Sequence, residues 1–264
     1  MIHNMLDQTT RSSTAELTLS ATVTRASQAS DTWAGTAHPS LLDTKTESQL
    51  IAFDNERYPH ALRSIESPPQ HLYVLGRTNQ PGDHQAIAIV GSRTASDRGL
   101  LTAHRIAEAL AHRGHTIVSG LAAGIDTQAH RGALAAGGRT IAVIGTGIDR
   151  TYPASNQALR DKIAATGAVV SQFVAGHPAS KTTFPARNVL IAGLSKASLL
   201  VELNERSGTR IEANIAIEQA KPVLLWAPLL AKAEWAQRFA RHDLVSFVDN
   251  VDDIAAVLSS ADGS

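Results

Sequence analysis

The chain has 264 residues, of which 43% are hydrophobic and 4% aromatic, so it is long enough to bury the core of one ordinary α/β domain. Lysine plus arginine and aspartate plus glutamate each number 24, which excludes a uniformly basic coat for nucleic acid but not a local basic patch. Cysteine is absent, which excludes disulfides, thiolate nucleophiles and cysteine-based zinc sites. No run of 18 apolar residues and no secretory signal is found, so we expect a cytoplasmic protein that does not enter a membrane.

The beginning of the chain is rich in hydroxyl side chains, since 16 of the first 46 residues are serine or threonine. No apolar period persists there, and burial cannot offset the entropy of ordering such a segment, so we expect a disordered arm over residues 1–46. An upstream segment over residues 47–85 follows. In it we expect a short helical or looped stretch from Ile51 to Ile65 and a short strand at 72–75.

From residue 86 to residue 264, short apolar runs alternate with helical stretches. Strands are predicted at 86–90, 116–119, 140–144, 168–171, 197–201, 222–226 and 244–248. Helices are predicted at 100–113, 125–136, 156–167, 188–194, 209–219, 232–240 and 251–258. Apolar strands without alternation are buried on both faces, and strands joined by helices form parallel crossovers. The fold class predicted is therefore α/β, with a doubly wound, mainly parallel sheet that binds its ligand at the carboxyl ends of the strands.

Four predicted strand ends carry glycine-rich or polar turns. These turns are Gly91-Ser92-Arg93, the stretch from Ser119-Gly120 to Asp126, Gly145-Thr146-Gly147, and Ser207-Gly208-Thr209. Glycine lets the backbone approach a ligand, and free N–H groups at helix starts attract anions, so the turns together predict a phosphate-binding rim. Each turn alone is more readily explained by loop geometry.

Other ligand classes find little support in the sequence. No GxxxxGK[ST] motif is present, and residues 145–150 lack the third glycine of a dinucleotide fingerprint, which disfavours an ATPase or a hydride-transfer enzyme. The histidines form no ligand cluster. We therefore expect neither a cofactor nor a metal.

Many short motifs recur in the order and at the spacing found in the DprA (Smf) family of DNA-processing proteins. They are Val90–Arg93, Ser119–Asp126, Ala129-His130, Gly132–Leu134, Gly138–Val143, Tyr152-Pro153, Phe184–Asn188 and Ile191–Ser195. The resemblance covers about residues 50 to 226. It implies a Rossmann-like domain that binds single-stranded DNA, forms a homodimer and loads a RecA-type recombinase onto the strand, without covalent chemistry.

The resemblance also implies roles for individual residues. Arg93 is expected to contact a phosphate through its planar fork, with an ion pair to Asp97 or Asp126 as the alternative. Lys181 is expected to neutralise the backbone while a base stacks on Phe184, unless that ring is buried under its loop.

The remaining DNA contacts are expected from donors on the same rim. Gly91, Ser92, Ser119 and Gly120 would offer backbone N–H and hydroxyl groups, or serve turn geometry alone. The residues expected to complete the rim are Arg187, Asn188, Ser207, Gly208 and Thr209, with Asn188 equally predicted as a helix N-cap. Asp126 and His130 are interpreted as structural, as a cap and a hydrogen-bonded histidine.

The pattern departs from the family at three positions. Ala123 stands where a basic residue is usual, Val189 replaces a second arginine, and Glu212 stands where a small or hydroxyl residue is typical. Gly208-Thr209-x-x-Glu212 is similar to the LOG group of enzymes, which hydrolyse the N-glycosidic bond of nucleoside monophosphates. In that alternative Glu212 would be the acid/base or oxocarbenium stabiliser and Arg187 the substrate clamp. A first-turn glutamate favoured by the helix dipole, and a binding-only nucleotide sensor, are the remaining interpretations.

Overall fold

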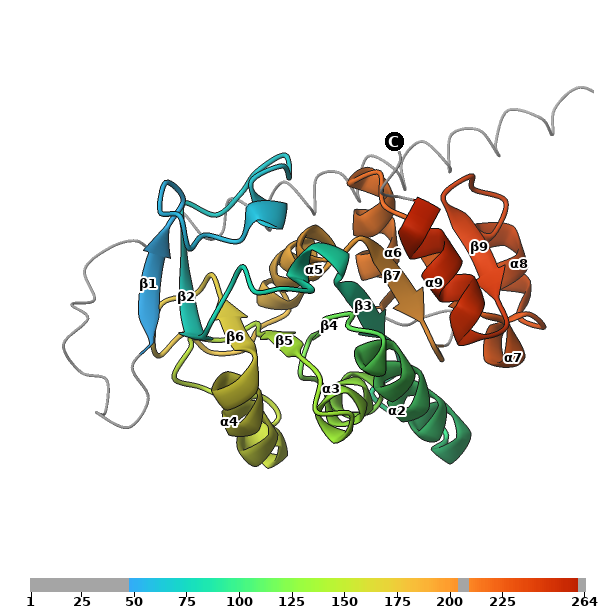
Figure 1. Cartoon of the computed structure of the whole chain (residues 1–264), viewed down its shortest axis with the longest axis horizontal. Coiled ribbons are helices and arrows are strands. Elements are labelled where there is room, and N and C mark those ends of the chain that lie inside the picture. Colours follow the sequence, from blue (N-terminus) through green and yellow to red (C-terminus); the bar gives the residue numbers. More distant parts are fainter. Residues whose placement is uncertain (1–47, 204–208, 261–264) are drawn as a thin grey trace, which may run out of the picture.

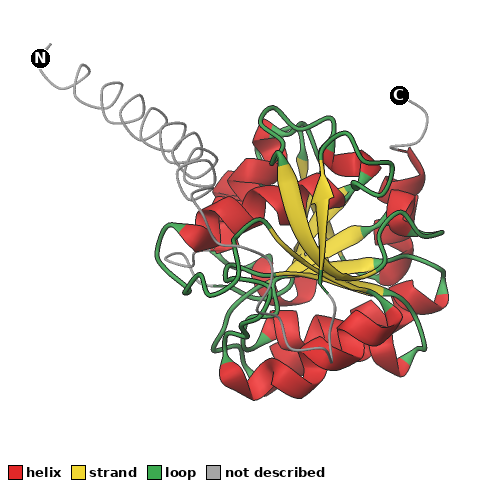
Figure 2. Cartoon of the chain, turned by 90° about the vertical axis from the view of Figure 1, so that its left-hand side faces the viewer, coloured by secondary structure: helices red, strands yellow, loops and turns green. Residues whose placement is uncertain are grey.

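The computed structural model describes residues 48–203 and 209–260, which build a nine-stranded sheet with helices on both faces (Figures 1 and 2). The strand order is β1-β2-β6-β5-β4-β3-β7-β8-β9. The strands are β1 (Gln49–Ala52), β2 (His71–Gly76), β3 (Ile87–Val90), β4 (Ile117–Ser119), β5 (Thr140–Val143), β6 (Ala168–Ser171), β7 (Ala197–Leu200), β8 (Val223–Trp226) and β9 (Val245–Val248). Strands β3 to β9 pair in parallel, whereas β2 pairs antiparallel with both β6 and β1.

The helices divide between the two faces because the strand side chains alternate between two sets of core residues. On one face α2, α3 and α9 pack on Ile87, Ile89 and Ile117, and α4 packs beside them on Ala142 and Val169. On the other face α5, α6 and α8 share one core with the opposite side chains of the sheet. The α-helices are α2 (Asp97–His112), α3 (Ile125–Ala135), α4 (Gln157–Thr166), α5 (Thr183–Leu194), α6 (Thr209–Glu218), α7 (Ala227–Leu230), α8 (Glu234–Phe239) and α9 (Val251–Ser260).

The order in which the chain visits the strands creates a topological switch point. From β3 the chain steps outward through β4, β5 and β6, then crosses the sheet to β7 on the other side of β3. Neighbouring connections thus diverge between the carboxyl ends of β3 and β7, which is where sheets of this kind hold their ligands. The predicted doubly wound, mainly parallel α/β fold is confirmed.

The upstream segment is built into the same sheet and core, and part of its prediction was wrong. The edge strand β1 (Gln49–Ala52) takes up the first two residues of the predicted helical or looped stretch, and the rest of that stretch forms turns and a short 3-10 helix at His60–Leu62, as predicted. Only Ile51 of this strand is buried, so the strand carries too little alternation to be recognised from its own residues. Tyr58 is fully buried, and its hydroxyl donates to the carbonyl of Pro69 (2.9 Å), which joins the segment to the core.

Helix α5 begins five residues earlier than predicted. The hydroxyl of Ser180 accepts hydrogen bonds from the backbone N–H groups of Thr182 (3.3 Å) and Thr183 (3.1 Å), so the helix is started by a side chain upstream of Phe184. Pro185 is tolerated in the first turn, where its missing N–H has no helical partner to lose. Asn188 therefore lies inside the helix, and its prediction as an N-cap was wrong. The predicted arm over residues 1–46 lies outside the described residues.

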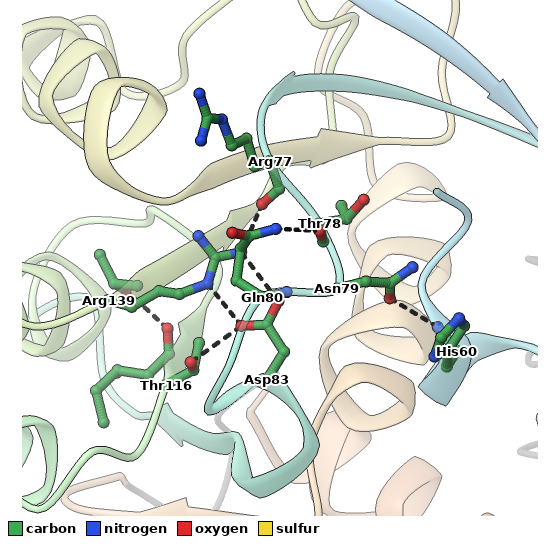
Figure 3. A network of polar contacts seen from close by, with 10 residues as sticks. His60, Arg77, Thr78, Asn79, Gln80, Asp83, Thr116 and Arg139 are labelled. Carbon is green, nitrogen blue, oxygen red and sulfur yellow. Dashed lines mark hydrogen bonds and ion pairs between the residues drawn. The ribbon is translucent and has the colours of Figure 1, made fainter. Parts of the chain in front are cut away.

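A polar network ties the loop after β2 to the amino ends of the central strands (Figure 3). Arg139 donates to both carboxylate oxygens of Asp83, through Nε at 2.6 Å and Nη2 at 3.0 Å. Thr116 donates to the same carboxylate at 3.0 Å, and the backbone N–H of Gln80 does so at 3.0 Å. The arginine and aspartate side chains are only 14% and 16% exposed, so the ion pair is shielded from water. It holds in place a loop that forms no strand of its own.

Breaking this ion pair is expected to destabilise the protein markedly. Asp83→Ala leaves a shielded guanidinium without its counter-ion, so the free energy of unfolding should fall by roughly 2–4 kcal/mol in urea titrations. Asp252→Ala is the matched control, because it breaks the Arg113–Asp252 pair (2.7 Å) whose side chains are 42% and 82% exposed. It should cost less than about 1 kcal/mol. Equal losses in the two variants would contradict the assigned role of Asp83.

Candidate functional site

A cavity of about 470 Å³, called here the switch-point cavity, opens beside the carboxyl end of β3. Its walls come from residues 90–94 after β3, from the start of α5 and from the first turn of α6. The structure brings many of the predicted site residues together on this wall, namely Gly91, Ser92, Arg93, Lys181, Phe184, Arg187 and Asn188. Ser207 and Gly208 lie outside the described residues, and Thr209 begins α6.

Three of these residues form an exposed cationic and aromatic rim, defined here as Arg93, Lys181 and Phe184. Arg93 and Lys181 are exposed, and Phe184 is half-buried. The guanidinium carbon of Arg93 lies 4.6 Å from the centroid of the Phe184 ring, within the range of a cation–π contact. Within residues 48–203 and 209–260 Arg93 forms no ion pair, so the alternative pairing with Asp97 or Asp126 is not found there.

Arg187, by contrast, is buried and holds the site together through hydrogen bonds, an arrangement called here the brace. Its Nη1 donates to the carbonyl oxygens of Gly120 (2.5 Å) and Val143 (3.3 Å), and its Nε donates to Oδ1 of Asn188 (3.1 Å). Burial lowers the pKa of Arg187, and the nearby Asp126 carboxylate opposes that effect. Helix α5 is thereby fixed to the ends of β4 and β5. A phosphate contact of Arg187 stays a prediction.

Glycine is required at position 120 by this brace. A Cβ atom there would lie 1.9 Å from Nη1 of Arg187, far inside contact distance. Gly91 meets a similar limit, because its Cβ would lie 2.5 Å from Cγ1 of Ile125. Close packing therefore favours glycine at both positions, and a ligand contact of their backbone N–H groups stays a prediction.

Two predicted donors already make hydrogen bonds inside the protein, so a ligand contact of either residue stays a prediction. Ser119 is fully buried, and its hydroxyl donates to the carbonyl of Ile89 (2.7 Å). The backbone N–H of Ser92 donates to the carbonyl of Glu202 (2.7 Å). Both hydrogen bonds join neighbouring parts of the sheet, so they hold the rim in place rather than offer themselves to an anion.

The helix start after β3 is occupied by a carboxylate of the chain itself. Glu202, directly beyond β7, accepts hydrogen bonds from the backbone N–H (2.8 Å) and the hydroxyl (2.6 Å) of Ser96, the N-cap residue of α2. After β4, the carboxylate of Asp126 similarly faces the backbone N–H of Ala122 (3.4 Å). Carboxylates of the chain itself thus offset the partial positive charge of these two helix starts, and phosphate binding at either start stays a prediction. Glu202 could not be identified from the sequence, because its partner Ser96 is 106 residues away.

Buried ionisable groups lie in and near the wall of the cavity, and Glu212 and Asp126 are among its lining residues. Glu212 is 1% exposed; its Oε1 accepts from the hydroxyl of Ser198 (2.6 Å), and its Oε2 has no hydrogen-bond partner among the described residues. Burial raises the pKa of Glu212 to about 7. Burial likewise raises the pKa of Asp126 and lowers that of His130 to about 3. His130 is therefore neutral, and its Nδ1 lies 2.7 Å from Oγ1 of Thr140, in line with the structural interpretation.

The described part of the chain offers no alternative site of two other kinds. Among its residues no three histidine, aspartate or glutamate side chains come together in a way that suits a metal ion. None of its helices is both long and apolar enough to span a bilayer.

Comparison with known proteins decides the family. The family model described as DNA recombination-mediator protein A matches residues 49–258, which is most of the chain. The chain belongs to this family. Among curated family members, it is 45% identical to the protein Smf of Synechocystis sp. over 173 residues, 64% of this chain and 44% of that protein. It is 40% identical to the DNA processing protein DprA of Streptococcus pneumoniae over 166 residues, 63% of this chain and 58% of that protein. The chain thus spans about half the length of the curated relatives it matches.

Solved structures of family members have the same fold. DprA from Streptococcus pneumoniae superposes with a TM-score of 0.72 at 32% identity, covering 80% of this chain and 74% of that one. DNA processing protein A from Helicobacter pylori, described for its unique single-stranded DNA binding mode, superposes with a TM-score of 0.70 at 25% identity. That match covers 82% of this chain and 96% of the other.

The carboxyl group of Glu212 predicts a pH-dependent stability. Its pKa is raised in the folded protein, so between about pH 4.5 and 7 the folded chain holds a proton that the unfolded chain has lost, and stability falls as the pH rises. Glu212→Gln keeps the hydrogen bond from Ser198 without the charge. The free energy of unfolding of this variant, relative to the natural chain, should rise by up to roughly 3 kcal/mol from pH 4.5 to pH 8. Parallel stability curves for the two proteins would refute the assignment.

Proposed function

We propose that this chain binds single-stranded DNA along the rim of Arg93, Lys181 and Phe184 and presents the strand to a RecA-type recombinase. The observation that carries the proposal is the exposed rim itself, which places two cations and an aromatic ring around the switch-point cavity. The role is that of a binding protein without covalent chemistry. It would act in the cytoplasm, where DNA and recombinase meet, and as a homodimer.

The family supports this role. Its description names a recombination mediator, and the similar Helicobacter pylori protein is described by its binding of single-stranded DNA. The rim residues lie within the matched range, residues 49–258. Because the chain spans only part of its curated relatives, the recombinase and the homodimer are supported by family membership alone.

The electrostatics of the rim favour a flexible polyanion over a mononucleotide. The helix starts after β3 and β4 are neutralised by Glu202 and Asp126, so an anion is held by side chains that reach outward. Side chains of this kind bind successive phosphates of a strand with little dependence on base sequence. The net charge of the chain is zero, so attraction to DNA depends on this local group of cations.

The nucleotide-hydrolase alternative has less support. Glu212, its candidate acid/base, is 1% exposed and is oriented by Ser198 at the base of α6. A general acid or base must come within hydrogen-bond reach of the reacting group, and the carboxyl of Glu212, although it lines the cavity, is almost fully buried and already bonded to Ser198. Arg187, the candidate clamp, is engaged by backbone carbonyl groups.

The proposal is tested by titrating fluorescent oligo-dT with single variants. Arg93→Ala and Lys181→Ala should each weaken binding by about tenfold, near 1.4 kcal/mol, because each removes a phosphate contact. Each should also reduce the slope of log affinity against log salt by about 0.7.

Lys162→Ala is the matched control, since Lys162 is an exposed lysine on α4, which packs on the face of the sheet opposite α5. Its affinity and salt slope should stay unchanged. The proposal is wrong if Arg93→Ala and Lys181→Ala, both shown to be folded by circular dichroism, bind oligo-dT as tightly as the natural chain.

A further inference from the structure

The ring of Phe184 is already in contact with protein on several sides. The guanidinium of Arg93 lies over it at 4.6 Å, and that of Arg187 lies 5.8 Å from its centroid. Its Cδ1 lies 3.2 Å from the position that a Cβ of residue 145 would take, so the ring rests against Gly145. A base could stack on the side taken by Arg93 only by displacing that cation.

A neighbouring aromatic ring is open where Phe184 is not. Tyr152 is 50% exposed, one of three large hydrophobic side chains in residues 48–203 and 209–260 with at least half of their surface in solvent. Its ring centroid lies 5.8 Å from that of Phe184, with the planes inclined by 47°. One side of the Tyr152 ring thus contacts Phe184 of the rim, and the rest of the ring is exposed to solvent.

The loop that carries Tyr152 is held in place by polar contacts on both sides of it. Thr146 donates to the carbonyl of Arg150 (3.2 Å), and Thr151 donates to Oε1 of Gln157 (2.6 Å). Asp149 accepts from the backbone N–H of Gly176 (2.7 Å). A ring held this way loses little conformational entropy when a ligand covers it, which favours its use as a binding surface.

We propose that Tyr152 is the base-stacking residue of this surface, and that Phe184 is a positioning residue that holds Arg93 on one side and Tyr152 on the other. The inference rests on the proposed binding of single-stranded DNA and adds to it the residue that contacts the bases. Arg93 and Lys181 then hold phosphates while Tyr152 receives a base. Every base has a π face, so this contact accepts any sequence.

The experiment separates base contacts from phosphate contacts by comparing oligo-dT with an abasic oligonucleotide of equal length. Tyr152→Ala should weaken binding of oligo-dT by about 5- to 100-fold, the loss expected for one stacked base, and leave the abasic strand and the salt slope unchanged. Tyr152→Phe keeps the ring and should bind oligo-dT as the natural chain does.

Two further variants complete the comparison. Leu101→Ala is the control, because Leu101 is also 50% exposed but lies on α2; it should bind both strands normally. Phe184→Leu should weaken binding of both strands, since releasing Arg93 affects a phosphate contact that the abasic strand retains.

The outcomes distinguish this inference from the function on which it rests. If Tyr152→Ala binds oligo-dT normally, or loses affinity for both strands equally, Tyr152 is not the stacking residue, although DNA binding by the rim stands. If the natural chain binds neither strand, the proposed function and this inference are both overturned.

Discussion

The geometry of the site depends on the hydrogen bonds that the buried guanidinium of Arg187 donates. This side chain comes from α5 on one face of the sheet and ends on the carbonyl oxygens of Gly120 and Val143, just beyond β4 and at the end of β5. Hydrogen bonds that involve a charged donor are stronger than neutral ones, and burial shields them from water. Because Phe184 lies one turn before Arg187 on the same helix, the brace also sets where the aromatic ring of the rim stands.

A second constraint is that the sheet neutralises its own helix starts. Many α/β proteins bind phosphate at the N-terminus of the helix that follows their first strand. Here Glu202 occupies that place, and its bonds to Ser96 connect β7 to the start of α2 across the switch point. The fold therefore keeps the usual location of a ligand site but presents outward-facing side chains instead of backbone amides. This difference suits a long, flexible ligand better than a small one held in a pocket.

Much of this architecture follows from local sequence patterns. The buried parallel strands are continuous apolar runs, so their number, order along the chain and fold class are predictable. Arg93 is expected from its place after a strand at the ligand-binding edge, whereas Lys181 and Phe184 are expected from the family resemblance. The edge strand β1 is not predictable, since it has one buried residue and a partner about 20 residues further along the chain.

The internal hydrogen bonds of the site could not be predicted, for a common physical reason. Ser92 and Ser119 are polar residues in the right loops, but the partners that use their hydrogen-bonding groups, Glu202 and Ile89, are remote in sequence. Local patterns do not reveal such partners. The start of α5 was predicted too late for a related reason. The hydroxyl of Ser180, which accepts from a backbone N–H of the first turn, lies before Pro185, and a proline in the sequence argues against a helix at that point.

The brace between Gly120 and Arg187 has a consequence for how this protein can change during evolution. Any side chain at position 120 would displace the guanidinium, and any shorter residue at position 187 would leave two carbonyl groups without their donor. Neither residue can be replaced alone without loss, so the two positions are expected to be inherited as a pair.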